Sequence, residues 1–250
     1  MPLPSPVNLS VVIPAYNEEK RLPATLERVR HYLSNRGDDL WEIVVVDDGS
    51  KDSTVSVVHH ASAKDQRIRL VSNPGNRGKG YAVRNGMLSA VGAWRLFSDA
   101  DLSAPIEELE KLIVGAGKQD AAISIGSRAV DRSLVAVHQS MFREMSGRFF
   151  NLAMRLVTGL PFLDTQCGFK LYRADAAQAV FKRQILDGFS FDVEDLVIAK
   201  RLGLKTVEIP VRWANVEGTK VSALSGLKSF ADLVQIRTYA ATGRYDQAHG

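Results

Sequence analysis

The chain has 250 residues, 45% of them hydrophobic and 24% charged, figures typical of a soluble globular protein that can bury a sizeable core. Its formal net charge of +4 suits an anionic ligand or an anionic membrane surface, and is too small to indicate nucleic-acid binding. The single cysteine, Cys167, excludes an internal disulfide and a zinc site built from cysteines, which favours a reducing compartment.

The N-terminal segment, MPLPSPVNLS, lacks the basic start and apolar core of a signal peptide. No run of 18 apolar residues is present to span a bilayer. We therefore expect a cytoplasmic protein. Any membrane contact is expected to be peripheral, on the inner face of the membrane.

Apolar, β-rich runs alternate with helical patterns through the first 130 residues. This alternation predicts an α/β fold with a mostly parallel sheet and helices on both faces. The predicted strands are 9–14, 41–50, 67–74, 93–101 and 121–128, and the predicted helices are 21–35, 51–64, 81–91 and 107–117.

The second half has a less regular pattern. Residues 141–159 read as a helix whose apolar arc faces either the core or a membrane surface. A second helix is predicted at 174–183, a strand at 205–213 and a last helix at about 225–242. Residues 164–173 and 189–203 receive no assignment. Because no linker is evident, we expect one domain over residues 1–250.

Polar residues follow the ends of five predicted strands: Asn17 and Glu18, Asp47 and Asp48, residues 76–79, Asp99 and Asp101, and Arg128. In parallel sheets, ligands bind beyond the carboxyl ends of the strands, so these residues are expected to form one site. The segment GNRGKG, residues 75–80, precedes a predicted helix. Its backbone N–H groups are therefore expected to form an anion cradle.

Asp99 and Asp101 stand two apart at the end of an apolar run. On an extended strand they would point to the same side, which is unfavourable unless a cation or a hydrogen-bond donor compensates them. A divalent ion that also holds a phosphate would do so. The alternative is a strand end that runs into a turn, with one Asp capping the following helix.

Seven motifs in this order resemble the family-two inverting glycosyltransferases, which have the GT-A (Rossmann-like) fold. VVIPAYNEE, EIVVVDDGSKDST and FSDADLS match the nucleotide-sugar signatures of that family. NRGKGYAVRNGM, DTQCGFKLY, GFSFDVEDLVIAKRLG and IPVRWANVEGTKVS resemble those of dolichyl-phosphate β-glucosyltransferases and their polyprenyl-phosphate relatives. The resemblance covers about residues 8–240. It implies a nucleotide-sugar-binding half at about 8–130 and an acceptor-binding half at about 131–240.

The resemblance also implies roles for single residues. The PAYNE segment lines the base and ribose, and Asp47 and Asp48 close over the base. Asp101 binds Mg²⁺ or Mn²⁺ on the diphosphate, Asp99 lies near ribose or sugar hydroxyls, and water can replace Ser103 as a ligand. Catalytic candidates are Asp99, Asp101, Arg128, Asp192 and Glu194; metal-ligand candidates are Asp101, Asp99 and Ser103. Nucleotide-sugar-binding candidates are Pro14, Ala15, Tyr16, Glu18, Asp47, Asp48, Lys79, Asp99, Ala100, Asp101, Arg128 and Lys220, the last in a loop expected to close over the diphosphate.

A lipid-phosphate acceptor changes the need for a base. A phosphomonoester has a second pKa of about 6, so it is mostly a dianion at neutral pH and already nucleophilic. It needs positive charge to hold it, for which the candidates are Arg128, Arg132, Arg143 and Lys170. If a base is used, it is Asp192 or Glu194; the alternatives are that these carboxylates orient the sugar or bond the CGFK segment.

The expected reaction moves glucose from UDP-glucose to dolichyl or polyprenyl phosphate, with inversion to a β-linked product. The alternatives are a GDP-mannose donor or a soluble hydroxyl acceptor on the same fold. More distant alternatives are a sugar-phosphate nucleotidyltransferase and an inactive sugar-nucleotide-binding module. The expected partners are a nucleotide sugar, a lipid phosphate and a membrane surface, with no nucleic acid.

Overall fold

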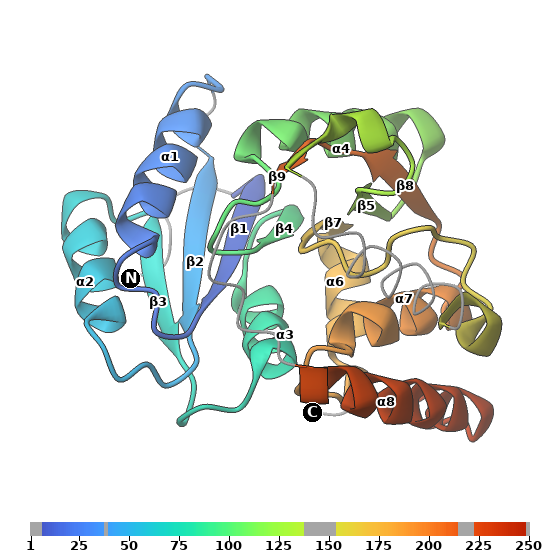
Figure 1. Ribbon diagram of the computed structural model, residues 1–250. Helices are drawn as coiled ribbons and strands as arrows, with labels where there is room; N and C mark the ends of the chain where they lie inside the picture. The colour runs from blue at the N-terminus through green and yellow to red at the C-terminus, as the bar shows by residue number, and fades with distance from the viewer. Residues whose placement is uncertain (1–6, 38–39, 138–153, 215–222, 249–250) are drawn as a thin grey trace.

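The computed structural model describes residues 7–37, 40–137, 154–214 and 223–248. A central sheet has the strand order β3-β2-β1-β4-β7-β5-β8 (Figure 1). Its strands are β1 Leu9–Ala15, β2 Trp41–Asp47, β3 Ile68–Ser72, β4 Trp94–Ser98, β5 Ile123–Ser127, β7 Phe169–Arg173 and β8 Thr206–Pro210. A small second sheet pairs β6, Val135–Val137, with β9, Trp213–Ala214.

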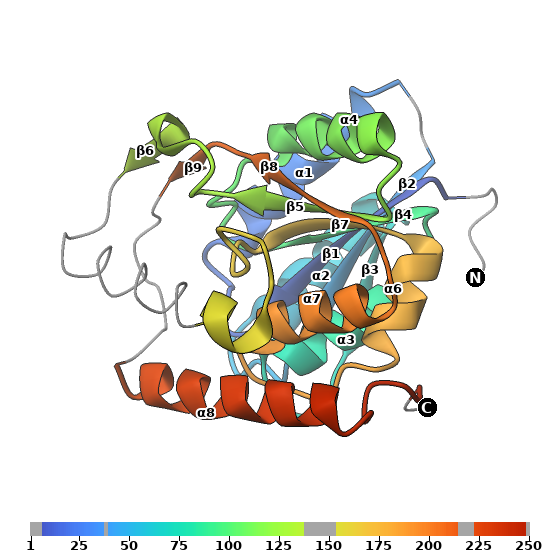
Figure 2. The same ribbon diagram turned by 90° about the vertical axis from the view of Figure 1, so that its right-hand side faces the viewer.

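The helices cover both faces of the sheet (Figure 2). One face carries α1 Leu22–Ser34, α2 Thr54–Lys64 and α4 Leu109–Gln119, and the other carries α3 Lys79–Ser89, α6 Ala174–Phe181, α7 Phe191–Arg201 and α8 Ala223–Ala241. Short 3₁₀ turns lie at Ile106–Glu108 and Arg132–Leu134, and residues 154–158 are helical. The predicted α/β fold with a mostly parallel, doubly covered sheet is confirmed.

The two faces are built from alternate residues of the same strands. In β1, Val11 and Ile13 pack into the cluster under α1 and α2, while Val12 packs into the cluster under α3. All three are fully buried, which explains why these strands read as continuous apolar runs. On α1, the apolar spacing of Leu22, Leu26, Val29 and Leu33 supplies the matching stripe.

β7 and α7 lie in the two segments that the sequence left unassigned.

β7 is a strand of the central sheet. It runs antiparallel between β4 and β5, whereas the other neighbouring strands of this sheet pair in parallel. The N-terminal end of β7 therefore lies at the sheet edge where the parallel strands have their carboxyl ends. This places residues 164–168 beside the polar strand ends, and the two halves of the chain share one sheet.

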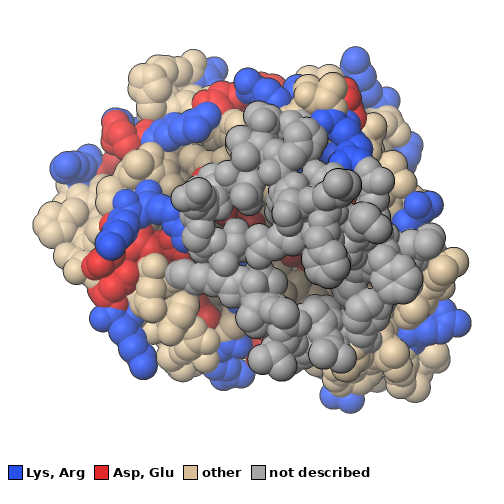
Figure 3. All heavy atoms as spheres, in the orientation of Figure 1, with Lys and Arg blue, Asp and Glu red and all other residues tan. Residues whose placement is uncertain are grey.

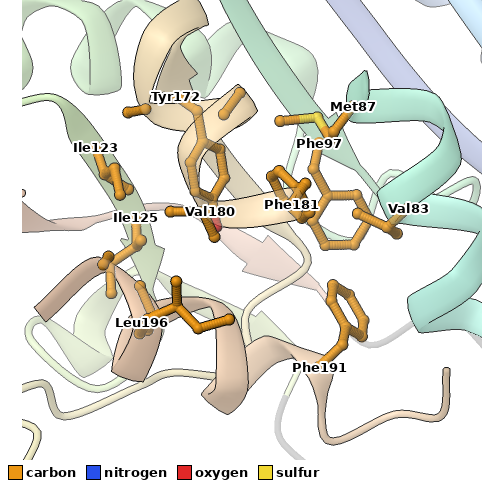
Figure 4. Close-up of a cluster of buried hydrophobic side chains, with 14 of the residues drawn as sticks. Val83, Met87, Phe97, Ile123, Ile125, Tyr172, Val180, Phe181, Phe191 and Leu196 are labelled. Carbon is orange, nitrogen blue, oxygen red and sulfur yellow. The ribbon is translucent and has the colours of Figure 1, made fainter. Parts of the chain in front are cut away.

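Aromatic packing fixes α7 against β4 (Figure 4). The rings of Phe97 and Phe191 meet edge to face at 5.6 Å, and those of Tyr172 and Phe181 do so at 5.2 Å. Because Phe97 lies next to the end of β4 and Phe191 begins α7, this contact brings the acidic start of α7 to the same edge of the sheet. The predicted helix at 141–159 lies outside the described residues except for 154–158.

Candidate active site

The acidic pair lies on a turn. β4 ends at Ser98, and Leu102 has a φ of 48°, so residues 99–102 leave the sheet. The prediction that Asp99 and Asp101 share one side of an extended strand is therefore wrong. The backbone N–H of Asp99 instead bonds the carbonyl of Gly168 at 3.0 Å, which joins this turn to the residue before β7.

Asp99 forms an ion pair with Lys79, with 2.7 Å between Oδ1 and Nζ. Burial raises the pKa of Asp99, although Lys79 acts in the opposite direction. Burial alone would lower the pKa of Lys79, but Asp99 and Asp192 outweigh it and the pKa is raised. The Asp99 carboxylate lies directly over Gly168, where a Cβ atom would stand 2.1 Å from Oδ2. A larger residue here would displace the carboxylate.

Asp101 is the carboxylate best placed to hold a metal ion. It is half-buried, and its Oδ1 accepts a hydrogen bond from the backbone N–H of Ser103 at 2.9 Å. The Ser103 carbonyl in turn accepts from the N–H of Ala214 at 2.9 Å. No cluster of three or more His, Cys, Asp or Glu that could hold a metal occurs among the described residues. A cation here would need further oxygen ligands from its substrate.

The expected anion cradle at the start of α3 is occupied by the protein itself. The N–H groups of Arg77 and Gly78 donate to the Asp48 carboxylate at 3.0 and 2.8 Å, and Asn73 Nδ2 donates to it at 2.8 Å. The N–H of Gly80 bonds the carbonyl of Asp187 at 2.8 Å. The prediction of a free cradle is wrong, because Asp48 supplies the anion and fixes the loop that carries Lys79.

The loops after β1 and β2 are joined to each other. Their hydrogen bonds run from Asp48 N–H to the Ala15 carbonyl at 2.9 Å, from Asn17 N–H to Ser50 Oγ at 2.9 Å and from Glu18 N–H to Thr54 Oγ1 at 2.8 Å. Pro14 and Tyr16 are half-buried beside them, and Ala100 is buried in the turn after β4. The Asp47 carboxylate accepts from the N–H groups of Gly49 and Ser50 at 3.2 Å. These residues therefore form one rim of the site.

Arg128 follows β5 and is held by a residue to which the sequence assigned no role. Its Nε and Nη2 donate to Oδ2 and Oδ1 of Asp164 at 2.6 and 2.8 Å. Burial alone would lower the pKa of Arg128, but the Asp164 carboxylate outweighs it and raises the pKa. The guanidinium also lies 5.4 Å from the ring of Trp213.

Lys170 lies in the core instead of the site surface. It is fully buried, and its Nζ contacts Asp192 Oδ1 at 2.7 Å, the Asp192 carbonyl at 2.8 Å and Asp195 Oδ2 at 3.2 Å. Tyr172 donates a hydrogen bond to Asp195. The prediction that Lys170 holds an acceptor phosphate is wrong. The alternative reading of Asp192, a bond to the CGFK segment, is confirmed.

Glu194 is fully buried and faces away from this group. Its carboxylate accepts from the N–H groups of Ile185 and Leu186 at 3.0 and 2.8 Å and from the Tyr245 hydroxyl at 2.9 Å. Burial raises the pKa of Glu194 to about 7. These contacts give Glu194 a structural role instead of the predicted catalytic one.

The described residues omit two candidates, since Lys220 and Arg143 lie outside them. Arg132 is exposed in the 3₁₀ turn after β5. The sequence analysis missed Asp164, Gly168 and Trp213 as site residues. Two of the quoted motifs contain them, DTQCGFKLY and IPVRWANVEGTKVS, but nothing in their spacing shows which side chains turn toward Arg128 and Asp99.

Comparison with known proteins decides the family. The family model described as glycosyl transferase family 2 matches residues 10–181, more than half of the chain. The chain belongs to glycosyl transferase family 2. Membership confirms the predicted glycosyltransferase class, and the residues matched include Lys79, Asp99, Asp101, Arg128 and Asp164.

Several relatives of this family 2 member are named as dolichyl-phosphate β-glucosyltransferases. The chain is 39% identical over 242 residues to a dolichyl-phosphate β-glucosyltransferase of Trichomonas vaginalis, and the match covers 93% of this chain and 74% of the relative. The enzymes of the same name from Drosophila melanogaster and Homo sapiens are 38% and 36% identical, over 92% and 95% of this chain and 74% and 77% of theirs.

Solved structures share the fold of this family 2 chain. Glucosyl-3-phosphoglycerate synthase from Mycobacterium tuberculosis, in complex with Mn²⁺, UDP-glucose and phosphoglyceric acid, matches with a TM-score of 0.65 at 22% identity, covering 93% of this chain and 80% of that one. Mannosyl-3-phosphoglycerate synthase from Rubrobacter xylanophilus matches with a TM-score of 0.65 at 17% identity, covering 98% and 77%. The predicted GT-A fold is confirmed.

Proposed function

We propose that this chain transfers glucose from UDP-glucose to dolichyl or another polyprenyl phosphate, with inversion to a β-linked product. The names of relatives that are 36 to 39% identical over most of the chain support the glucose and the lipid phosphate. The observation that carries the proposal is the meeting of Lys79–Asp99, Asp101 and Arg128–Asp164 at one edge of the sheet. The UDP-glucose bound by the structural neighbour supports the choice of donor.

The charges of the site support the use of a divalent cation. Two cations stand against three carboxylates, a formal charge of −1: Lys79 and Arg128 against Asp99, Asp101 and Asp164. Elsewhere on this face of the described part of the molecule, acidic and basic side chains lie side by side (Figure 3). A nucleoside diphosphate would therefore meet net repulsion unless a cation accompanies it.

The residues fit such an ion. Asp101 offers a hard oxygen donor, and Asp99, held by Lys79, borders the same turn. Mg²⁺ or Mn²⁺ bound there would neutralise charge on the diphosphate as it leaves. The protein's own contribution is to fix that carboxylate through the backbone N–H of Ser103.

The acceptor supplies its own nucleophile. An oxygen of the lipid phosphate attacks the anomeric carbon, the bond from that carbon to the diphosphate breaks, and UDP leaves with the bonding electrons. The dianionic acceptor gives up no proton, so this step needs no general base. Arg128 provides fixed donors for the phosphates.

Peripheral contact with a membrane is part of this proposal, since the acceptor is a lipid. Among the described residues, no helix has the length and apolar character needed to cross a bilayer. Leu156 belongs to the predicted apolar arc and is 75% exposed, whereas Met154 beside it is fully buried. We assign Leu156 to the membrane-facing side of this segment.

The proposal is tested with purified protein, Mn²⁺ and a short polyprenyl phosphate, incubated separately with radiolabelled UDP-glucose, UDP-galactose and GDP-mannose. We expect label in the organic phase from UDP-glucose, and none when the matching polyprenol replaces the phosphate. Transfer from GDP-mannose alone would overturn the assignment of UDP-glucose as the donor. Release of UDP without labelled lipid would overturn the assignment of a lipid phosphate as the acceptor.

A further inference from the structure

The Arg128 guanidinium is held along one edge. Asp164 takes Nε–H and one Nη2–H, and its Oδ2 also accepts the backbone N–H of Arg128 at 3.0 Å. A guanidinium has five N–H donors in a rigid plane, so three remain, on Nη1 and on the outer side of Nη2. Two of these three, one on each Nη, form the end of the fork, which is an edge that meets a phosphate with two parallel hydrogen bonds.

Arg128 is also limited in how far it can turn. The Trp213 ring lies 5.4 Å from its central carbon, and the side chain is 32% exposed, so its free end reaches solvent. A guanidinium held by a carboxylate on one edge and an aromatic ring on its face presents its remaining donors in a defined direction. An arginine without these partners would sample many rotamers and lose that direction.

Asp164 is itself fixed. Its side chain is 3% exposed, and Oδ1 accepts the N–H of Gln166 at 3.2 Å. The N–H groups of Leu163 and Asp164 both donate to the Glu208 carboxylate on β8, at 2.9 and 2.7 Å. A strand of the central sheet thus anchors the backbone that carries Asp164, and the anchor extends through Asp164 to Arg128.

We propose that Asp164 is a positioning residue: it aims the Nη1 and Nη2 end of Arg128 at a phosphate oxygen of the substrates. This inference rests on the proposed function for the identity of the phosphates. Asp164 acts through Arg128 and touches no substrate. Its pairing with Arg128 neutralises the arginine, so what the pair offers is directed hydrogen bonding more than net positive charge.

The test is a double-mutant cycle on Asp164→Asn and Arg128→Ala. We expect Asp164→Asn to lower kcat/KM for the short polyprenyl phosphate by about 10²-fold, the cost of misplacing a binding group by about 1 Å. In the Arg128→Ala background the same substitution should change kcat/KM by less than about twofold. A further loss in that background comparable to the loss in the wild type would overturn the proposal.

A matched control is available on the surface. Asp175 binds Arg173 with the same two-nitrogen geometry, at 2.7 and 2.9 Å, but the pair is exposed at the end of β7. Asp175→Asn should leave kcat/KM unchanged. Glu208→Gln is a milder variant that keeps the Asp164 carboxylate and loosens its backbone. It should lower kcat/KM in the wild type and have no effect beside Arg128→Ala; an equal loss in both would argue against positioning.

Binding separates this inference from the proposed function. Calorimetry with UDP and Mn²⁺, and with the short polyprenyl phosphate, needs no turnover. If the wild type transfers no sugar, the proposed function fails, yet weaker phosphate binding in Asp164→Asn that disappears beside Arg128→Ala still supports positioning. Unchanged binding of both ligands and unchanged kcat/KM in a folded Asp164→Asn protein would refute it.

Discussion

Substituting Gly168 tests whether Asp99 sits where catalysis needs it. A Cβ at position 168 would stand 2.1 Å from Asp99 Oδ2 and 2.4 Å from Cγ, and such a contact must open to at least 3.0 Å. In Gly168→Ala the carboxylate therefore withdraws by about 1 Å, and its 2.7 Å contact with Lys79 is lost. We expect kcat/KM to fall about 10²-fold, a loss of about 2.7 kcal/mol in transition-state stabilisation.

The assay is transfer of radiolabel from UDP-glucose, with circular dichroism and thermal unfolding to verify the fold. Gly117→Ala is the matched control, since a Cβ there meets nothing within 4 Å. Gly117 lies inside α4, so this change should leave activity intact and stabilise the protein by about 0.5–1 kcal/mol. Activity of Gly168→Ala equal to that of the control would refute the reasoning.

Three other outcomes are expected. Asp101→Asn should lower the rate of sugar transfer at least about 10²-fold and remove the Mn²⁺ dependence of UDP binding, as measured by calorimetry. Turnover near that of the wild type would show that Asp101 is not a metal ligand. Burial raises the pKa of Glu194 from 4.5 to about 7, so the folded state binds this proton more tightly than the unfolded state does. The free energy of unfolding should therefore fall by about 3 kcal/mol as the pH rises from about 4.5 to 7. Urea unfolding at pH 5 and pH 8 should show a smaller pH effect in Glu194→Gln than in the wild type, and equal effects would contradict this account. Leu156→Ser should weaken sedimentation with anionic liposomes without changing the melting temperature, and unchanged sedimentation would remove Leu156 from the membrane contact.

The sequence predicted the parallel strands well because their burial on two faces leaves a strong apolar signal. Val11, Val12 and Ile13 read as a strand whichever face each one joins. β7 carried no comparable signal, since two of its five residues, Lys170 and Arg173, are charged. A lysine inside a central strand is tolerated only because Asp192 and Asp195 approach from α7, more than 20 residues later in the chain.

The sequence predicted which residues lie in the site better than it predicted the contacts that they make. Lys79, Asp99, Asp101 and Arg128 do lie at one edge of the sheet, as the strand ends indicated. The roles of Asp48 and Glu194 could not be read from spacing, because each carboxylate accepts from backbone N–H groups of a loop whose course the sequence does not show. A motif shows that an acid is present. Only the folded chain shows whether its oxygens are already occupied.

The position of β7 also affects how this enzyme can be made. While only the first 130 residues have left the ribosome, β4 and β5 each lack the neighbour that β7 will provide. Open strand edges of this kind invite wrong pairing, so the nascent chain depends on prompt arrival of Phe169–Arg173. The same stretch delivers Gly168 under Asp99 and Asp164 beside Arg128. Synthesis of the second half therefore completes the sheet and also supplies the carboxylate that holds Arg128, so a fragment that ends before Asp164 leaves this guanidinium without that partner.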